Sequence, residues 1–133
     1  MILTKECDYA FRIIRQLADG EIHTVATICG EETIPLNFAY KILKRLEKAS
    51  ILKSYRGQSG GYKLIKGLGG IALYDVVMAI DGPIYFNTCL KGEETCPNND
   101  DGKDCIFHEE FCRIQDMLIQ SLSDKTIGDF IGH

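Results

Sequence analysis

Four cysteines lie close together in the last third of this 133-residue chain: Cys89, Cys96, Cys105 and Cys112. Thiolates are soft ligands that favour iron–sulfur clusters or zinc. Structural zinc sites usually contain a ligand pair separated by about two to four residues. Here the three intervals contain six, eight and six residues. Such open spacing favours a loop wrapped around a cluster over a site for a single ion.

A histidine in the same stretch adds a possible ligand. If a helix begins near Cys105, then His108 and Cys112 lie on the same face as Cys105, one and two turns further along. Cys112 would then lie roughly 10 Å from Cys105 along the axis, too far for one cluster unless Cys105 belongs to the preceding loop. The fourth ligand is therefore left open between His108 and Cys112 at this point.

The basic residues are concentrated in the middle of the chain. Residues 34–66 contain eight lysines and arginines and a single acid, a net charge of +7, although the whole chain carries −4. Residues 1–33 and 67–133 carry −3 and −8. Because screening limits a charge's field to about 10 Å, a local basic patch is what binding to nucleic acid phosphates requires.

The first third predicts a helix-turn-helix. Thr4 is placed to cap a helix that ends at Gly20, and Thr24 to cap a short helix from 25 to 29. Residues 30–33 read as a turn, and Pro35 opens a third helix, where its missing N–H costs nothing. The third helix has an apolar face and a basic outer face, as a DNA-recognition helix requires.

A hairpin is predicted directly after this helix. Residues 52–55 and 62–65 alternate like two strands, and 56–61 supply three glycines for the turn. A hairpin in this position is a wing, whose tip can reach a minor groove or a phosphate. The predicted DNA-contacting residues of helix and wing are Asn37, Phe38, Tyr40, Lys41, Lys44, Arg45, Arg56, Gln58, Ser59 and Gly60.

The C-terminal half is predicted to be helical around a polar loop. Residues 67–70 read as a flexible break, 71–80 as an amphipathic helix and 87–104 as a loop. A long helix follows from residue 105 or 106 to about 121, and 124–131 are expected to close the chain as a short helix. The apolar stripe of the long helix has nearly heptad spacing, which favours pairing with a second subunit. Its residues are Phe107, Phe111, Ile114, Leu118 and Leu122.

These motifs resemble the IscR/NsrR type of bacterial winged-helix repressors over roughly residues 1–131. The similarity rests on Thr4-Lys5, Asp8-Tyr9-Ala10 and Arg12 in the first helix, on 34–46 as recognition helix and on 71–81 as the next helix. The wing sequence Ser54-Tyr-Arg-Gly-Gln-Ser-Gly-Gly-Tyr62 is the most specific match. The resemblance implies a mainly α winged helix-turn-helix with a small β-hairpin and a long C-terminal dimerisation helix. The expected division is a DNA-binding region, 1–66, and a cluster-binding loop with dimerisation helix, 67–133, packed together as one domain.

The resemblance also implies a ligand set. Sensing members of that family bind a [2Fe–2S] or [4Fe–4S] cluster through three cysteines, which match Cys89, Cys96 and Cys105, plus a variable fourth ligand. Asp8 joins His108 and Cys112 as a candidate, since some members use an acid of the partner's first helix; alternatively it pairs with Arg12 at i,i+4. Other members carry no cluster.

The expected function is a transcription regulator, most simply a repressor, that binds double-stranded DNA as a homodimer and is modulated by a cluster sensing redox state, nitric oxide or iron. Two alternatives remain: a cluster-free regulator switched by thiols or zinc, and a regulatory subunit that docks on a metabolic enzyme. No catalytic motif is found. The chain shows neither a signal peptide nor an apolar run of 18 residues, so a cytoplasmic location is expected. Cys29 is expected to pack in the core, and Cys7 in the core or at an interface.

Overall fold

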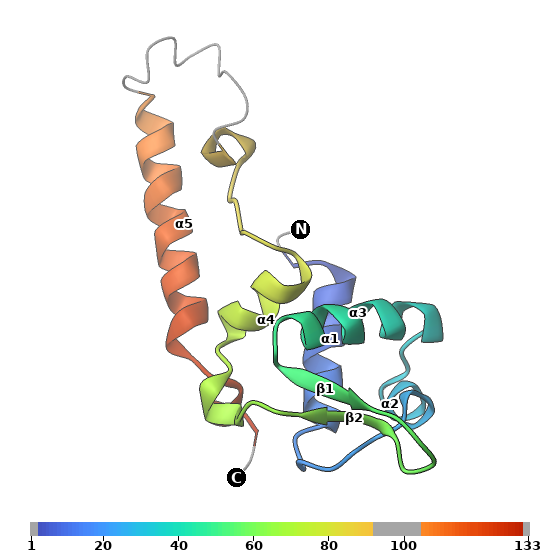
Figure 1. The fold of residues 1–133 in the computed structure, drawn as a ribbon. Coiled ribbons are helices and arrows are strands. Elements are labelled where there is room, and N and C mark those ends of the chain that lie inside the picture. Colours follow the sequence, from blue (N-terminus) through green and yellow to red (C-terminus); the bar gives the residue numbers. More distant parts are fainter. Residues whose placement is uncertain (1–2, 92–104, 132–133) are drawn as a thin grey trace.

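The computed structural model describes residues 3–91 and 105–131 and shows a mainly helical winged helix-turn-helix protein (Figure 1). This confirms the predicted fold class. The described helices and 3-10 turns are α1 (Lys5–Gln16), α2 (Val25–Glu32), α3 (Leu36–Lys48), η1 (Leu68–Gly70), α4 (Leu73–Ile80), η2 (Thr88–Lys91), α5 (Ile106–Asp124) and η3 (Ile127–Asp129). The strands β1 (Leu52–Tyr55) and β2 (Gly61–Leu64) form the antiparallel hairpin.

The two predicted threonine caps are present. The Thr4 hydroxyl accepts the backbone N–H of Cys7 at 3.2 Å, and the Thr24 hydroxyl accepts that of Thr27 at 3.2 Å. Each bond satisfies one of the N–H groups that have no partner within the helix. The starts of α1 and α2 are therefore encoded locally, by the cap residue and its neighbours.

The end of α2 differs from the prediction. The helix continues through Gly30 to Glu32, and Thr33 then adopts a left-handed conformation with φ 55°. The predicted turn at 30–33 was therefore wrong, and the connection to α3 begins at Thr33. Glu32 is the reason, because its carboxylate accepts hydrogen bonds from Arg15 and Gln16 of α1. These contacts hold the last turn of α2 in place.

Other boundaries move by one to four residues. The first helix ends at Gln16, before the expected Gly20. Pro35 is the N-cap of α3 and lies just outside the helix. At α4, the Asp75 carboxylate accepts the backbone N–H of Ala72 at 2.8 Å, so the helix begins at Leu73. The stretch 67–70, expected as a flexible break, contains the 3-10 turn η1.

One hydrophobic core joins the first four helices and the hairpin. Fully buried side chains come from α1, α3 and α4, such as Ile13, Ile42 and Val76. The chain end returns to this core, since the N–H of Ile127 donates to the carbonyl of Ile71 at 2.8 Å. A single core therefore spans the predicted boundary at residue 66, and that two-part division stays a prediction.

The two isolated cysteines lie at the core. Cys7 has no exposed surface, and burial next to Asp81 raises the pKa of its thiol to about 12. Cys29 is partly buried against the same core, and burial raises its pKa too. Raised thiol pKa values mean that both sulfurs stay protonated near neutral pH.

Helix α5 is arranged differently from the other helices. Figure 1 shows it running alongside α4, with η2 beside its first half. Leu118 and Leu122 pack against the core, yet none of the helix's 19 residues is buried. No helix among the described residues is long and apolar enough to cross a lipid bilayer.

Candidate nucleic-acid interface and candidate metal centre

Helix α3 presents a polar, basic face to solvent. Its buried positions recur with helical spacing at Ala39, Ile42, Leu43 and Leu46. The opposite face must therefore point outward, and its side chains are exposed. These exposed residues are Asn37, Tyr40, Lys41, Lys44 and Lys48.

Two predicted contact residues lie on the flank of α3 that faces α1. The Phe38 ring packs against Tyr9, with centroids 6.1 Å apart. The Arg45 guanidinium lies 2.7 Å from the Glu6 carboxylate and 3.3 Å from the Ile80 carbonyl. Arg45 ties α3 to α1 and α4, yet its side chain is still 43% exposed, and its predicted contact with DNA stays a prediction. The position of Arg45 follows from the packing of α3 against α1 and α4, and the pattern of charges in the sequence does not predict that packing.

The wing is held along the outer edge of β2 and is open at its tip. His23, in the loop before α2, exchanges two backbone hydrogen bonds with Tyr62 of β2, at 2.8 and 2.9 Å. A Cβ on Gly61 would lie 2.3 Å from the His23 carbonyl oxygen, so only glycine permits this approach. At the tip, Arg56 and Gln58 are exposed, as is Ser59, while Gly60 is partly buried.

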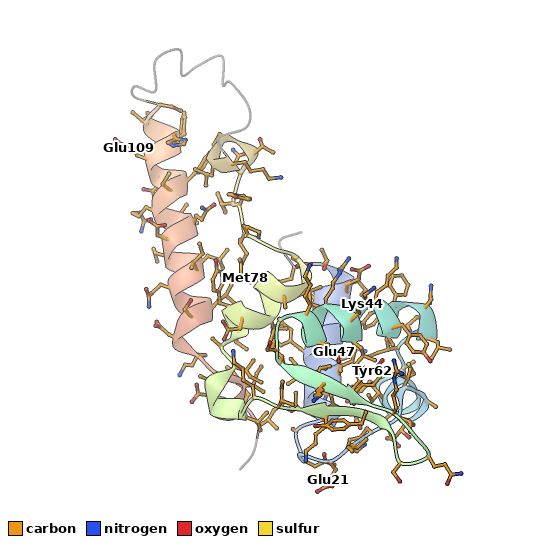
Figure 2. The ribbon with its side chains drawn as sticks, viewed as in Figure 1. Glu21, Lys44, Glu47, Tyr62, Met78 and Glu109 are labelled. Carbon is orange, nitrogen blue, oxygen red and sulfur yellow. The ribbon has the colours of Figure 1, made fainter. Side chains whose placement is uncertain are left out.

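Glu47 is a residue of this surface that the sequence reasoning did not select. Its carboxylate oxygen Oε1 accepts both the backbone N–H of Ser54 at 3.1 Å and the Ser54 hydroxyl at 2.9 Å. Figure 2 shows Glu47 between α3 and the hairpin. The sequence feature that could have drawn attention to Glu47 is its charge, because it is the sole acidic residue among residues 34–66.

The described thiols of the candidate metal centre gather at one end of α5. Cys89 lies in η2, which packs against α5, and Cys105 is the N-cap of that helix, just outside it. The Cys112 sulfur lies 3.6 Å from Nε2 of His108. Cys96 lies outside the described residues. In the described ranges, no three His, Cys, Asp or Glu side chains are close enough to hold a metal ion.

Aromatic residues and one amide hold η2 near α5. The Phe86 N–H donates to the Gln115 side-chain oxygen at 2.9 Å, and the Phe86 ring packs on Phe111 with centroids 5.4 Å apart. These contacts place Cys89 next to the helix that Cys105 begins. Thiolates with a nearby imidazole are a donor set that fits an iron–sulfur cluster or zinc.

Asp8 lies elsewhere in the same chain. It forms the i,i+4 ion pair with Arg12, at 3.0 Å, and lines a cleft together with Leu122 near the C-terminal end of α5. Leu122 and Cys105 are separated by about 25 Å along the helix at 1.5 Å per residue. An Asp8 ligand for these thiols would therefore have to come from a second subunit.

A basic recognition helix, an adjoining open wing and a projecting C-terminal helix define the class of winged helix-turn-helix DNA-binding regulators. Residues 3–133 match the Rrf2 family, described as iron-dependent transcriptional regulators, and the chain belongs to this family. Transcription regulators of this family bind DNA, and the chain is a transcription regulator, not an enzyme.

Two relatives agree with this assignment. The rrf2-like HTH-type transcriptional regulator of Rhodobacter capsulatus is 28% identical over 98% of this chain and 92% of its own length. The HTH-type transcriptional regulator IscR of an Enterobacter species is 29% identical over 100% of this chain and 81% of its own.

Two solved structures share the fold. CymR, the global cysteine regulator of B. subtilis, has a TM-score of 0.79 at 21% identity, covering 98% of this chain and 95% of that one. T. potens IscR has a TM-score of 0.75 at 16% identity, covering 98% and 85%.

Proposed function

We propose that this protein is a homodimeric, DNA-binding transcription regulator whose DNA affinity is modulated by an iron–sulfur cluster. Cys89, Cys96 and Cys105 would hold the cluster, with His108, Cys112 or the partner subunit's Asp8 as fourth ligand. The observation that carries the proposal is the placement of Cys89 and Cys105 at the same end of α5. When bound, the cluster supplies a redox- and nitric oxide-reactive centre.

The DNA-binding surface in this proposal is the outer face of α3 together with the wing tip. Arg56 and Gln58 can reach a groove edge, while Lys41 and Lys44 can contact phosphates. Arg56→Ala is expected to weaken binding by about 1–3 kcal/mol if the guanidinium reads a base. Lys44→Ala is expected to weaken binding to all sequences alike and to reduce the salt dependence.

The exposed apolar side chains of α5 support the dimer. Ile106, Phe107 and Met117 are 75%, 64% and 56% exposed, although each is large and apolar. Leu118 and Leu122 of the predicted stripe pack against the chain's own core, and Phe107 stacks on Phe111 of the same helix. The exposed apolar surface of Ile106, Phe107 and Met117 is what remains for pairing with a second copy. A two-fold dimer would also present two recognition helices to two DNA half-sites.

The cluster is tested on protein purified without oxygen. Absorption between 300 and 600 nm, with iron and acid-labile sulfide counts, is expected to reveal a cluster and to distinguish two irons from four. Cys89→Ala, Cys96→Ala and Cys105→Ala should each lose iron and keep their helical circular dichroism. Cys29→Ala is the matched control and should keep its iron. Full iron in all three ligand variants would refute the assignment.

A thiol- or zinc-switched regulator is the second candidate. The 3.6 Å contact between the Cys112 sulfur and His108 favours it, because a thiol beside an imidazole is a typical zinc or redox pair. Colourless protein that contains zinc and loses it in Cys112→Ala would support this candidate over the cluster. DNA binding through α3 and the wing is common to both.

A further inference from the structure

The hairpin has two edges, and both are closed by groups outside it. Ser54 and Tyr62 face each other across the two strands. Their outward-pointing backbone groups must find partners elsewhere, since a pair of this type does not bond across the ladder. On the β2 side, the partner is the His23 backbone, at 2.8 and 2.9 Å.

On the β1 side, the partner is the side chain of Glu47. It takes the Ser54 N–H that a third strand would otherwise accept, and it accepts the Ser54 hydroxyl with the same oxygen. Glu47 belongs to α3, whose outer face is the proposed recognition surface. The Glu47 carboxylate therefore joins the helix to the wing at Ser54, two residues before Arg56.

The surroundings suit an ionised carboxylate. Hydrogen bonds from Ser54 lower the pKa of Glu47, and the nearby Lys53 acts in the same direction. The Tyr62 side chain of β2 is partly buried near Glu47, and this burial and the charge of Glu47 raise the pKa of its phenol. The carboxylate is thus charged at neutral pH and stands in an otherwise basic stretch.

We propose that Glu47 is a positioning residue that fixes the wing relative to the recognition helix and thereby sets the preference for specific over non-specific DNA. The inference rests on the proposed DNA-binding surface. Its reasoning has two parts. The Ser54 bonds hold the wing in one position, so that α3 and the tip read DNA together. The negative charge also repels phosphates, which weakens binding wherever that fit is absent.

The test uses the full chain and two DNA duplexes. One is recovered by the wild-type protein from a random library, and the other is a shuffled duplex of the same composition. Affinities are measured by fluorescence anisotropy at several salt concentrations. The first variant is Glu47→Gln, which removes the negative charge. The second is Ser54→Ala, which removes the hydrogen bond from the Ser54 hydroxyl and keeps the charge of Glu47. Asp116→Asn on the exposed surface of α5 is the control for total charge.

Each variant has its own expected result. Ser54→Ala should weaken binding to the selected duplex by about 3–10-fold, the effect of one hydrogen bond, and leave the shuffled duplex within about twofold. Glu47→Gln, which keeps the acceptor oxygen for Ser54, should tighten the shuffled duplex by about 2–5-fold and lower the ratio of selected to shuffled affinity by the same factor. Asp116→Asn should leave both affinities unchanged.

A repeated library selection with Ser54→Ala, which weakens the contact between wing and helix and keeps the charge, separates positioning from general stability. The preference for the bases read by the wing should weaken, while that for the bases read by α3 is kept. Equal changes on both duplexes in Glu47→Gln, or a wild-type affinity of Ser54→Ala for the selected duplex, would overturn the inference while leaving the proposed surface intact. A wild-type protein that enriches no sequence and binds neither duplex would overturn the surface itself.

Discussion

Glu32→Ala tests how α1 positions the helix-turn-helix. The residue Glu32 is only 7% exposed, and among the described residues it is the charged residue that is buried. Its carboxylate accepts from Arg15 Nε at 3.1 Å, from a second Arg15 nitrogen and from Gln16 at 2.9 Å. The Glu32 carbonyl also accepts from Arg12 at 3.4 Å. Truncation removes the three side-chain bonds and with them the attachment of α2 to α1.

The expected loss of stability can be estimated from these bonds. A buried hydrogen bond to a charged group contributes about 1.5–3 kcal/mol. Because Arg15 is largely exposed and can bind water once released, we expect a total of about 2–4 kcal/mol for Glu32→Ala, well short of three full bonds. With an unfolding entropy of about 0.28 kcal/mol/K for a chain of this length, Tm should fall by about 7–14 °C.

The assay is thermal unfolding by circular dichroism across pH. Glu31→Ala is the matched control, because Glu31 is the exposed neighbour on the same helix and loses the same charge. Hydrogen bonds from Arg15 lower the pKa of Glu32 in the folded state. Its contribution is therefore present above the unfolded pKa of about 4.3 and is lost as the pH falls toward the folded value. The gap between wild type and Glu32→Ala should shrink below about pH 4.

Two results would contradict this reasoning. A Tm for Glu32→Ala within about 2 °C of that for Glu31→Ala would mean that the carboxylate does not hold α2. A Tm difference that stays constant from pH 7 to pH 3 would mean that the effect comes from lost packing and not from the ionised group.

Three further predictions concern the core, the wing and α5. Cys7, with its pKa of about 12, should resist alkylation until the protein unfolds, as mapped by mass spectrometry, and stability should fall as pH rises above the ordinary thiol value near 9. Gly61→Ala should push the wing from His23 and weaken DNA binding at least about tenfold with helical content unchanged; Gly67→Ala, which meets no neighbour within 4 Å, should bind as wild type. Phe107→Glu should shift the protein from dimer to monomer in light scattering, and an unchanged mass would show that Phe107 lies outside the interface.

The starts of the helices and the hairpin followed from local sequence. Thr4 and Thr24 cap helices because a hydroxyl one position outside a helix can reach an N–H three residues on. The strands fell where alternation and three glycines predicted them, within one residue. The basic face of α3 could also be predicted from the sequence, since helical periodicity places its lysines opposite the buried aliphatic residues. All of these signals lie within a few residues of one another.

The thiol ligand set depended on family resemblance as well as on composition. Spacing alone showed that a soft ligand site was possible, and the resemblance selected Cys89, Cys96 and Cys105. The structure adds that Cys89 and Cys105 lie at the same end of α5 and that Cys105 is just outside the helix. The identity of the fourth ligand stays a prediction.

Tertiary structure alone decided how the elements are joined. Arg15 and Glu32 are 17 residues apart, Glu6 and Arg45 are 39 apart, and both ion pairs exist because packing brings the helices together. Glu47 was a lone acid in the sequence and became a wing contact only through the placement of Ser54. The local sequence determined which segments form helices, strands and a basic face, because periodicity and capping act over a few residues. Which charged side chains pair with one another depended on contacts between distant segments, and no local sequence pattern records those contacts.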